Sequence, residues 1–126
     1  DRLERLACPV VIDHMGHVPT SRGVNDAAFQ RVLRLLALEK VWVKISGAYR
    51  ISNAAPPYAD ALPFAKALIA AAPGRCVFGT DWPHPHFDGQ MPNDGALLDF
   101  LDDAAPNARV RDAILVDNPV RLYGFS

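Results

Sequence analysis

The sequence predicts an α/β fold in which short strands and helices alternate around a parallel sheet. Three short runs of apolar, largely β-branched residues alternate with segments whose apolar residues recur every three or four positions. Such alternation requires right-handed crossovers, which make consecutive strands parallel. The connections after the strands are long and hold every histidine, whereas those after the first two helices are short. Because ligands of parallel sheets bind beyond the carboxyl ends of the strands, we expect a functional site in the long connections.

The first strand is predicted at residues 9–13, a continuously apolar run that is typical of a strand covered on both faces. A loop over residues 15–25 leads to a helix that Asn25 or Asp26 can cap. The apolar stripe of this helix has the spacing i, i+3, i+4 and i+7 and consists of Phe29, Val32, Leu33 and Leu36.

The second strand is predicted at residues 41–46, with Lys44 on the same face as Trp42 and Ser46. An ammonium group inside a sheet is costly unless it is paired, so we expect Lys44 to contact Asp13 or Asp81.

A loop over residues 47–57 precedes a helix that Asp60 can cap and that residues 73–74, Pro-Gly, end. The predicted buried stripe of this helix consists of small and aliphatic residues: Ala61, Ala65, Leu68, Ile69 and Ala72.

The third strand is predicted at residues 75–79 and is followed by a loop over residues 82–93. Asn93 or Asp94 can cap the next helix, which carries Leu97, Leu98 and Leu101. A last helix over residues 108–116 is expected to break at residues 117–119, Asp-Asn-Pro. Tyr123 and Phe125 are expected to pack back onto the body of the protein.

Composition narrows the class of protein. Half of the residues are hydrophobic, enough for the core of the single domain that 126 residues favour. The net charge is −1 with both signs interspersed, which argues against a nucleic-acid or membrane-surface partner. No apolar run is long enough to span a membrane and no signal peptide is apparent, so a cytoplasmic location is expected. Cys8 and Cys76 are expected to be buried free thiols.

Asp81 and His14 are the strongest candidates for catalysis because each follows a buried strand. The Asp81 carboxylate can act as a general base for water or ligate a metal, and the alternative is a turn or capping aspartate. His14 can donate a hydrogen bond to a developing oxyanion or ligate zinc. His17 lies further into the loop, where a histidine bonded to backbone carbonyls is an equal alternative.

Two further residues are candidates for substrate binding. The planar fork of Arg50 suits a carboxylate, with a surface arginine as the alternative. His84 is expected to hydrogen-bond the substrate or Asp81, in preference to binding a metal together with His86. No phosphate-binding glycine loop, serine elbow or Cys-x-x-Cys pair is present. Water attack assisted by Asp and His is the simplest chemistry that these residues offer.

Several motifs together resemble a known family. They are Asp-His-Met-Gly-His at 13–17, Val-Lys-Ile-Ser-Gly at 43–47 with Arg50, Gly-Thr-Asp-Trp-Pro-His-Pro at 79–85, and Asn-Pro at 118–119. In this order they resemble the amidohydrolase-related TIM-barrel hydrolases, and among these the 2-pyrone-4,6-dicarboxylate hydrolase (lactonase) group.

The resemblance implies a (β/α)₈ barrel in which the three strands are the sixth, seventh and eighth. It further implies that Asp81 activates the hydrolytic water, that His14 polarises the lactone carbonyl, and that Arg50 binds a carboxylate of the small-molecule substrate. The substrates of this group come from aromatic compound catabolism, and the reaction in this group uses no metal or other cofactor.

The chain departs from the family pattern because it has no first-strand His-x-His and no room for five earlier strands. Residues 1–126 are therefore expected to be a single C-terminal segment of a longer enzyme and to be inactive alone, with a homo-oligomer as one assembly open to the whole enzyme. Two alternatives remain. The parent is a zinc-dependent hydrolase or decarboxylase with His14 and Asp81 as ligands, or the chain is a non-catalytic binding module. The unpaired edges of an open sheet predict poor solubility for the isolated chain.

Overall fold

The computed structural model describes residues 2–125 and has a parallel three-stranded sheet of order β1-β2-β3. The strands are β1 (Val10–Ile12), β2 (Val41–Ile45) and β3 (Cys76–Phe78). In the register, Val10 lies opposite Val41, and Val43 lies opposite both Ile12 and Cys76. The predicted α/β fold with parallel strands is confirmed, and each strand lies within its predicted range.

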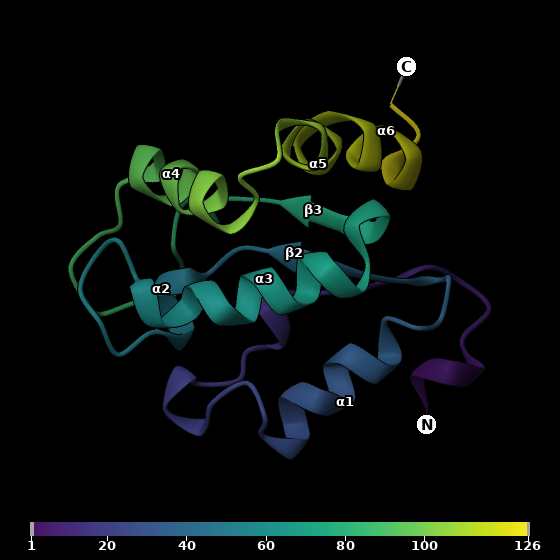
Figure 1. Cartoon of the computed structure of the whole chain (residues 1–126), viewed down its shortest axis with the longest axis horizontal. Helices are drawn as coiled ribbons and strands as arrows, with labels where there is room; N and C mark the ends of the chain where they lie inside the picture. The colour runs from purple at the N-terminus through teal and green to yellow at the C-terminus, as the bar shows by residue number, and fades with distance from the viewer. Residues whose placement is uncertain (1, 126) are drawn as a thin grey trace.

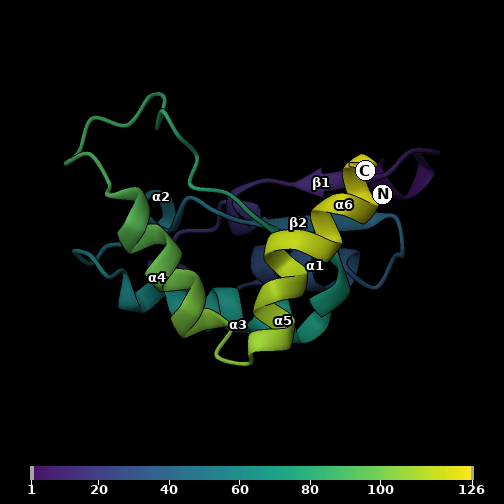
Figure 2. The same ribbon diagram turned by 90° about the horizontal axis from the view of Figure 1, so that it is seen from above.

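The main helices follow one another along the sheet in the same order as the strands (Figure 1). Seen from above, α3, α4 and α5 lie on the same side of β2 (Figure 2). The α-helices are α1 (Ala27–Leu35), α2 (Ala48–Ile51), α3 (Leu62–Ala71), α4 (Asp94–Ala104), α5 (Ala108–Asp112) and α6 (Asn118–Tyr123). Short 3₁₀ turns occupy Leu3–Arg5, His14–Gly16, Thr20–Arg22, Ala59–Ala61 and Pro73–Arg75.

The core forms between the sheet and these helices. Phe29 of α1 and Phe64 of α3 are at most 2% exposed and meet edge to face, with ring centroids 4.6 Å apart. Every residue of the predicted stripe of α3 is buried. In α1, Leu33 is only partly buried, because Leu35 also faces the core. Burial of these apolar faces is the main force that holds the helices on the sheet.

Two of the predicted caps are correct and one is wrong. The side chain of Asp26 accepts a hydrogen bond from the Ala28 amide, and that of Asn93 accepts one from the Ala96 amide. Asp60 does not cap α3. The turn Ala59–Ala61 precedes that helix, its N-cap is Ala61 without a side-chain bond, and the Asp60 carboxylate accepts instead from hydroxyls of neighbouring loops.

Other expectations about burial and loops need correction. Cys8 is exposed, whereas Cys76 is buried and its thiol donates to the Ala72 carbonyl. Leu98 is 42% exposed, because the buried face of α4 consists of Leu97, Phe100, Leu101 and Ala104. Tyr123 and Phe125 are 50% and 62% exposed and lie against each other rather than on the body. The predicted loop 47–57 contains the short helix α2.

The predicted helix break at residues 117–119 is wrong. After α5 the chain continues through a π-helical turn, Ala113–Asp117, directly into α6. Pro119 lies in the first turn of α6, where a missing amide hydrogen costs little. The wide turn directs Asn118 inward, where it is 2% exposed. Its amide nitrogen donates to the Pro73 carbonyl at 2.9 Å and to the Cys76 carbonyl at 2.8 Å.

Between residues 2 and 125, none of the helices has the length and apolar character needed to cross a membrane.

The Asn118 side chain joins the C-terminal helix to the start of β3, so Asn118→Ala should destabilise the chain. Two carbonyls then lose their donor, and a buried acceptor without a partner costs about 1–3 kcal/mol. Urea denaturation monitored by circular dichroism measures the loss. Asp117→Ala, at the exposed neighbouring position, is the control and should change stability by less than about 0.5 kcal/mol. Equal midpoints for the two variants would contradict the role given to Asn118.

Candidate active site

Side chains from the loops after all three strands converge on the Asp81 carboxylate. Its Oδ2 accepts a hydrogen bond from the Tyr49 hydroxyl at 2.6 Å and from Nε of Arg50 at 2.5 Å. Nδ1 of His14 lies 3.9 Å from the same oxygen. Three residues predicted for the site, Asp81, His14 and Arg50, are therefore brought together at the carboxyl ends of the strands.

The backbone at these strand ends is unusual. His14, Asp81 and His84 have φ values of 49°, 67° and 57°, in the left-handed region that non-glycine residues rarely occupy. Such a conformation costs about 1–3 kcal/mol for each residue and is concentrated at functional sites. In this protein it directs the side chains of residues that follow β1 and β3 toward one another.

Tyr49 and Arg50 reach Asp81 because the chain turns into α2 immediately after Gly47. Gly47 has a φ of 63°, and a Cβ at this position would lie 2.9 Å from Nδ1 of His14. The glycine therefore provides both the turn into α2 and the space for the imidazole. Tyr49 is not among the residues predicted for the site, although its place beside Arg50 in the loop after β2 could have indicated it.

The Asp81 carboxyl is held in its ionised form. Partial burial alone raises its pKa, but hydrogen bonds from Tyr49 and Arg50, and the positive charges of Arg50 and of His14 when it is protonated, lower the pKa below its usual value. Burial and the hydrogen bond to Asp81 raise the pKa of the Tyr49 hydroxyl. Tyr49 is therefore a proton-bearing donor to a carboxylate that can only accept.

The His14 imidazole is kept neutral near pH 7. Partial burial lowers its pKa, and the carboxylates of Asp81 and Asp13 oppose this effect without reversing it. Its Nδ1 lies 3.1 Å from the Ser46 hydroxyl at the end of β2. A neutral imidazole in this position can share a proton with an oxygen of a bound molecule.

Charged neighbours complete the electrostatics of the site. Lys44 pairs with Asp13, Nζ to Oδ1 at 2.6 Å, which confirms the first of its two predicted partners. Arg50 also donates from Nη2 to the Pro85 carbonyl at 2.8 Å, so its guanidinium joins the loop after β3 to α2. The site therefore contains two cations beside two carboxylates.

The other predicted histidines lie in different surroundings. His17 is exposed and lies edge-on to His14, with ring centroids 5.8 Å apart. The side chain of His84 is 3% exposed, with Nδ1 3.1 Å from the Tyr49 hydroxyl and Nε2 3.2 Å from the Asp94 carboxylate. His84 thus reaches the Asp81 carboxylate through Tyr49. His86 is exposed.

The described residues do not by themselves form a metal site. Within residues 2–125 no group of three or more His, Cys, Asp or Glu side chains is arranged to hold a metal ion. The two candidate ligands are His14 and Asp81, and Oδ2 of Asp81 already accepts from Tyr49 and from the positively charged Arg50.

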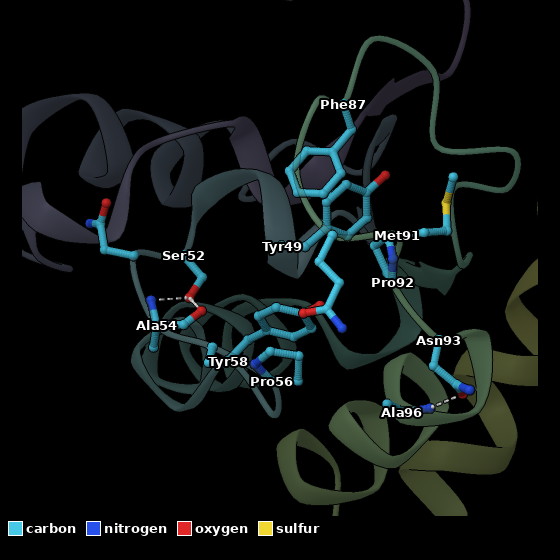
Figure 3. A pocket seen from close by; sticks show the side chains of 13 residues that line it. Tyr49, Ser52, Ala54, Pro56, Tyr58, Phe87, Met91, Pro92, Asn93 and Ala96 are labelled. Atoms are coloured by element: carbon cyan, nitrogen blue, oxygen red, sulfur yellow. Dashed lines mark hydrogen bonds between the residues drawn. The ribbon is translucent and has the colours of Figure 1, made fainter.

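A pocket of about 440 Å³ lies beside this cluster and shares Tyr49 with it. Figure 3 shows the Tyr49 ring next to Phe87, with Tyr58 and Pro56 on another part of the wall. The lining residues carry no charged side chain. The pocket is bounded by the loop after α2 and the loop after β3, which runs past α2 before it reaches α4 (Figure 2).

Comparison with known proteins assigns the family. Residues 1–125 match the sequence profile of one family, described as amidohydrolase. The chain belongs to the amidohydrolase family. Its α/β fold matches that of the family, because solved structures of 2-pyrone-4,6-dicarboxylic acid hydrolases superpose on 98% of the chain.

Two relatives of this amidohydrolase are named as hydrolases of lactones. The 4-sulfomuconolactone hydrolase of Hydrogenophaga intermedia is 47% identical over 126 residues, covering 98% of this chain and 42% of the relative. The 2-pyrone-4,6-dicarboxylate hydrolase of Comamonas testosteroni is 39% identical, with coverages of 98% and 43%. A structure from Acinetobacter baumannii, described as a "probable 2-pyrone-4,6-dicarboxylic acid hydrolase" with citric acid bound, is 27% identical with a TM-score of 0.81. The match covers 98% of this chain and 46% of that structure's chain. The chain thus spans less than half the length of these relatives.

Asp60 braces the loops that carry the site of this amidohydrolase. Its carboxylate accepts from Thr20 in the loop after β1, and from the Ser52 hydroxyl and the Asn53 amide after α2. Partial burial alone raises the pKa of Asp60, but these hydrogen bonds lower it below the usual value. These contacts join the segment that follows His14 to the segment that follows Arg50.

Gly47→Ala should disturb His14 as well as stability in the amidohydrolase chain. A left-handed alanine costs about 1–2 kcal/mol, and its methyl group also displaces the imidazole. Gly124→Ala is the matched control, because Gly124 has the same left-handed backbone, with φ 71° and ψ 31°, and a Cβ there meets nothing within 4 Å. Urea denaturation and the NMR resonances of His14 measure both effects. Equal losses of stability, with His14 unmoved in both variants, would show that Gly47 leaves no essential space for the imidazole.

Asp60→Asn should weaken the dependence of folding stability on pH between about pH 3 and 7. A folded-state pKa below the unfolded value stabilises the fold above the unfolded pKa of about 4, and this stabilisation is lost as the pH falls through the folded pKa. The Asn variant lacks this term, so it is less stable than the wild type at pH 7 and the difference shrinks toward pH 3. Thermal melting between pH 3 and 7 provides the comparison, and a constant difference over that range is the contrary result.

Proposed function

We propose that this amidohydrolase chain contributes the hydrolytic half of the site of an enzyme that opens a lactone of a carboxylated small molecule. The observation that carries the proposal is the ionised Asp81 carboxylate, beside a neutral imidazole and a guanidinium at the carboxyl ends of parallel strands. A base, a carbonyl-polarising group and an anion-binding group are the parts that ester hydrolysis of an anionic substrate requires.

The two oxygens of Asp81 have different surroundings. Tyr49 and Arg50 both donate to Oδ2. Oδ1 is thus the oxygen that accepts a proton from water. As that proton transfers, the water oxygen forms a bond to the lactone carbonyl carbon, and the carbonyl oxygen becomes an oxyanion. His14 donates to this oxyanion, and a preorganised donor of this kind is typically worth ~10²–10³-fold in rate.

The tetrahedral intermediate then breaks the ring bond between the carbonyl carbon and the ester oxygen. The electron pair of that bond goes to the ester oxygen, which takes the proton held by Asp81. The ring opens into a carboxylic acid and a hydroxyl group, and Asp81 returns to its ionised form. Each atom of the water is then present in the product.

The names of the relatives support an acidic substrate. Both hydrolases name lactones that carry acid groups, and the Acinetobacter baumannii protein has citric acid bound. In this chain Arg50 uses Nε and Nη2 for Asp81 and Pro85, so further N–H groups of its guanidinium are the donors for a substrate carboxylate. His17, exposed beside His14, extends the polar surface on which such a group would bind.

The same proposal gives the chain its place in the enzyme. Residues 1–126 form a C-terminal segment whose strands β1, β2 and β3 are the sixth, seventh and eighth of a (β/α)₈ barrel. Coverage of less than half of each relative supports this, as does the parallel order of the sheet.

In the full-length enzyme, Asp81→Asn should lower kcat for 2-pyrone-4,6-dicarboxylate or 4-sulfomuconolactone by about 10²–10⁴-fold, because an amide cannot take the proton from water. Substrate binding should change little. Steady-state assays of ring opening measure both. Asp88→Asn, an exposed aspartate in the same loop, is the matched control and should keep wild-type kcat. A fully active Asp81→Asn enzyme would overturn the proposed function.

A further inference from the structure

A continuous chain of hydrogen-bonding groups leads from Asp81 to the protein surface. The Tyr49 hydroxyl lies 2.6 Å from Oδ2 of Asp81 and 3.1 Å from Nδ1 of His84. On the other side of the ring, Nε2 of His84 lies 3.2 Å from Oδ1 of Asp94. The four residues come from α2, from the loop after β3 and from the first position of α4. Two of them, His84 and Asp94, play no part in the mechanism given above.

Counting donors along this chain fixes the direction of each hydrogen bond. The Asp81 carboxylate only accepts, so the single hydroxyl hydrogen of Tyr49 points to it. The Tyr49 oxygen then accepts from Nδ1 of His84, and Nε2 on the other side of the ring faces the Asp94 carboxylate.

Packing holds the middle of this chain in one arrangement. The Tyr49 residue is 5% exposed and the His84 side chain 3%, whereas the Asp94 side chain is 46% exposed. The Tyr49 ring meets the His84 ring at an interplanar angle of 86° and the Phe87 ring at 69°. The His84 amide also donates to the Asp81 carbonyl at 2.7 Å, so the same turn presents both side chains.

The electrostatics explain why Asp81 needs a neutral donor in addition to a cation. Arg50 at 2.5 Å draws the carboxylate toward itself, and His14 faces it from the loop after β1. The Tyr49 hydroxyl adds a second, directional bond to the same oxygen. Two donors on Oδ2 fix the rotation of the carboxylate, so that Oδ1 points in one fixed direction.

We propose that Tyr49 and His84 are positioning residues that hold the Asp81 carboxylate in the orientation needed to take a proton from water, with Asp94 anchoring His84. The inference rests on the proposed function, since it gives the base its orientation. It assigns to His84 a role behind the base, so that of the two contacts expected from the sequence, the substrate or Asp81, it favours the second, made through Tyr49.

The test uses the full-length enzyme, with 2-pyrone-4,6-dicarboxylate and 4-sulfomuconolactone as substrates. Tyr49→Phe keeps the ring and removes only the hydroxyl, and it should lower kcat by about 10–100-fold with KM within about twofold of the wild type, because the base is misdirected. His84→Asn should show the same split between kcat and KM. Asp94→Asn should show a smaller loss of kcat, because the anchor is further from Asp81, and Asp94→Glu should restore most of it.

Two matched controls separate positioning from general damage to the loop. Tyr58→Phe removes a hydroxyl from the wall of the neighbouring pocket, and His86→Asn changes an exposed histidine of the same loop. Both should keep the kcat of the wild type. Thermal melting of all variants tests whether kcat falls in step with stability. A loss of kcat that follows melting temperature, or appears equally in the controls, overturns the inference.

A spectroscopic readout tests the chain independently of activity. In protein labelled with ¹⁵N at histidine, Nδ1 of His84 should have the chemical shift of a nitrogen that carries hydrogen, because it donates to the Tyr49 hydroxyl, and Tyr49→Phe should change that signature. A wild-type Nδ1 without hydrogen overturns the arrangement of donors.

The outcomes also separate this inference from the proposed function. If the Asp81→Asn enzyme is active, Asp81 is not the base, and both the proposed function and the positioning role are rejected. An inactive Asp81→Asn enzyme together with Tyr49→Phe at wild-type kcat leaves the base in place and removes only the positioning role.

Discussion

The Asp81 carboxylate is the contact on which the arrangement of the three polar loops depends. It joins α2, through Tyr49 and Arg50, to the loop after β3, and it faces His14 from the loop after β1. Without it, Arg50 would be a largely buried cation whose remaining partner is the Pro85 carbonyl, and such a charge is costly. The group proposed to carry out the chemistry therefore also keeps its own surroundings in place.

The opposite end of the sheet is held by bonds of another kind. Asn118 donates to the carbonyls of Pro73 and Cys76, and Nε of Arg75 donates to the Val41 carbonyl at 3.1 Å. These contacts join the start of β3 to its neighbours through backbone acceptors, and none of them reaches the polar loops. The division is the one expected for parallel α/β folds, where one end of the strands provides stability and the other provides the site.

The parts of the structure that follow from periodicity could be predicted. The three strands, the parallel sheet and the stripe of α3 follow from apolar spacing, and the pair of Lys44 with Asp13 follows from the cost of an unpaired ammonium. The meeting of Asp81, His14 and Arg50 follows from the rule that parallel strands end at one edge of the sheet.

Other features depend on local backbone that apolar spacing does not report. Tyr49 points to Asp81 only because Gly47 starts a short helix within a predicted loop. The inward course of Asn118 depends on a π-helical turn, which a search for the 3.6-residue period does not detect, so Pro119 indicated a break where the helix continues. Asp60 resembles a helix cap in sequence, yet an intervening 3₁₀ turn directs its carboxylate to Thr20.

The left-handed backbone at His14, Asp81 and His84 has a consequence for how such a site can diverge. The course of the main chain, rather than the identity of the side chain, sets the direction in which each of these positions points. A different residue that tolerates the same torsion angles would point its side chain in the same direction and place a different functional group there. Descendants of one ancestral loop can therefore exchange reactivity position by position while the path of the polypeptide stays the same.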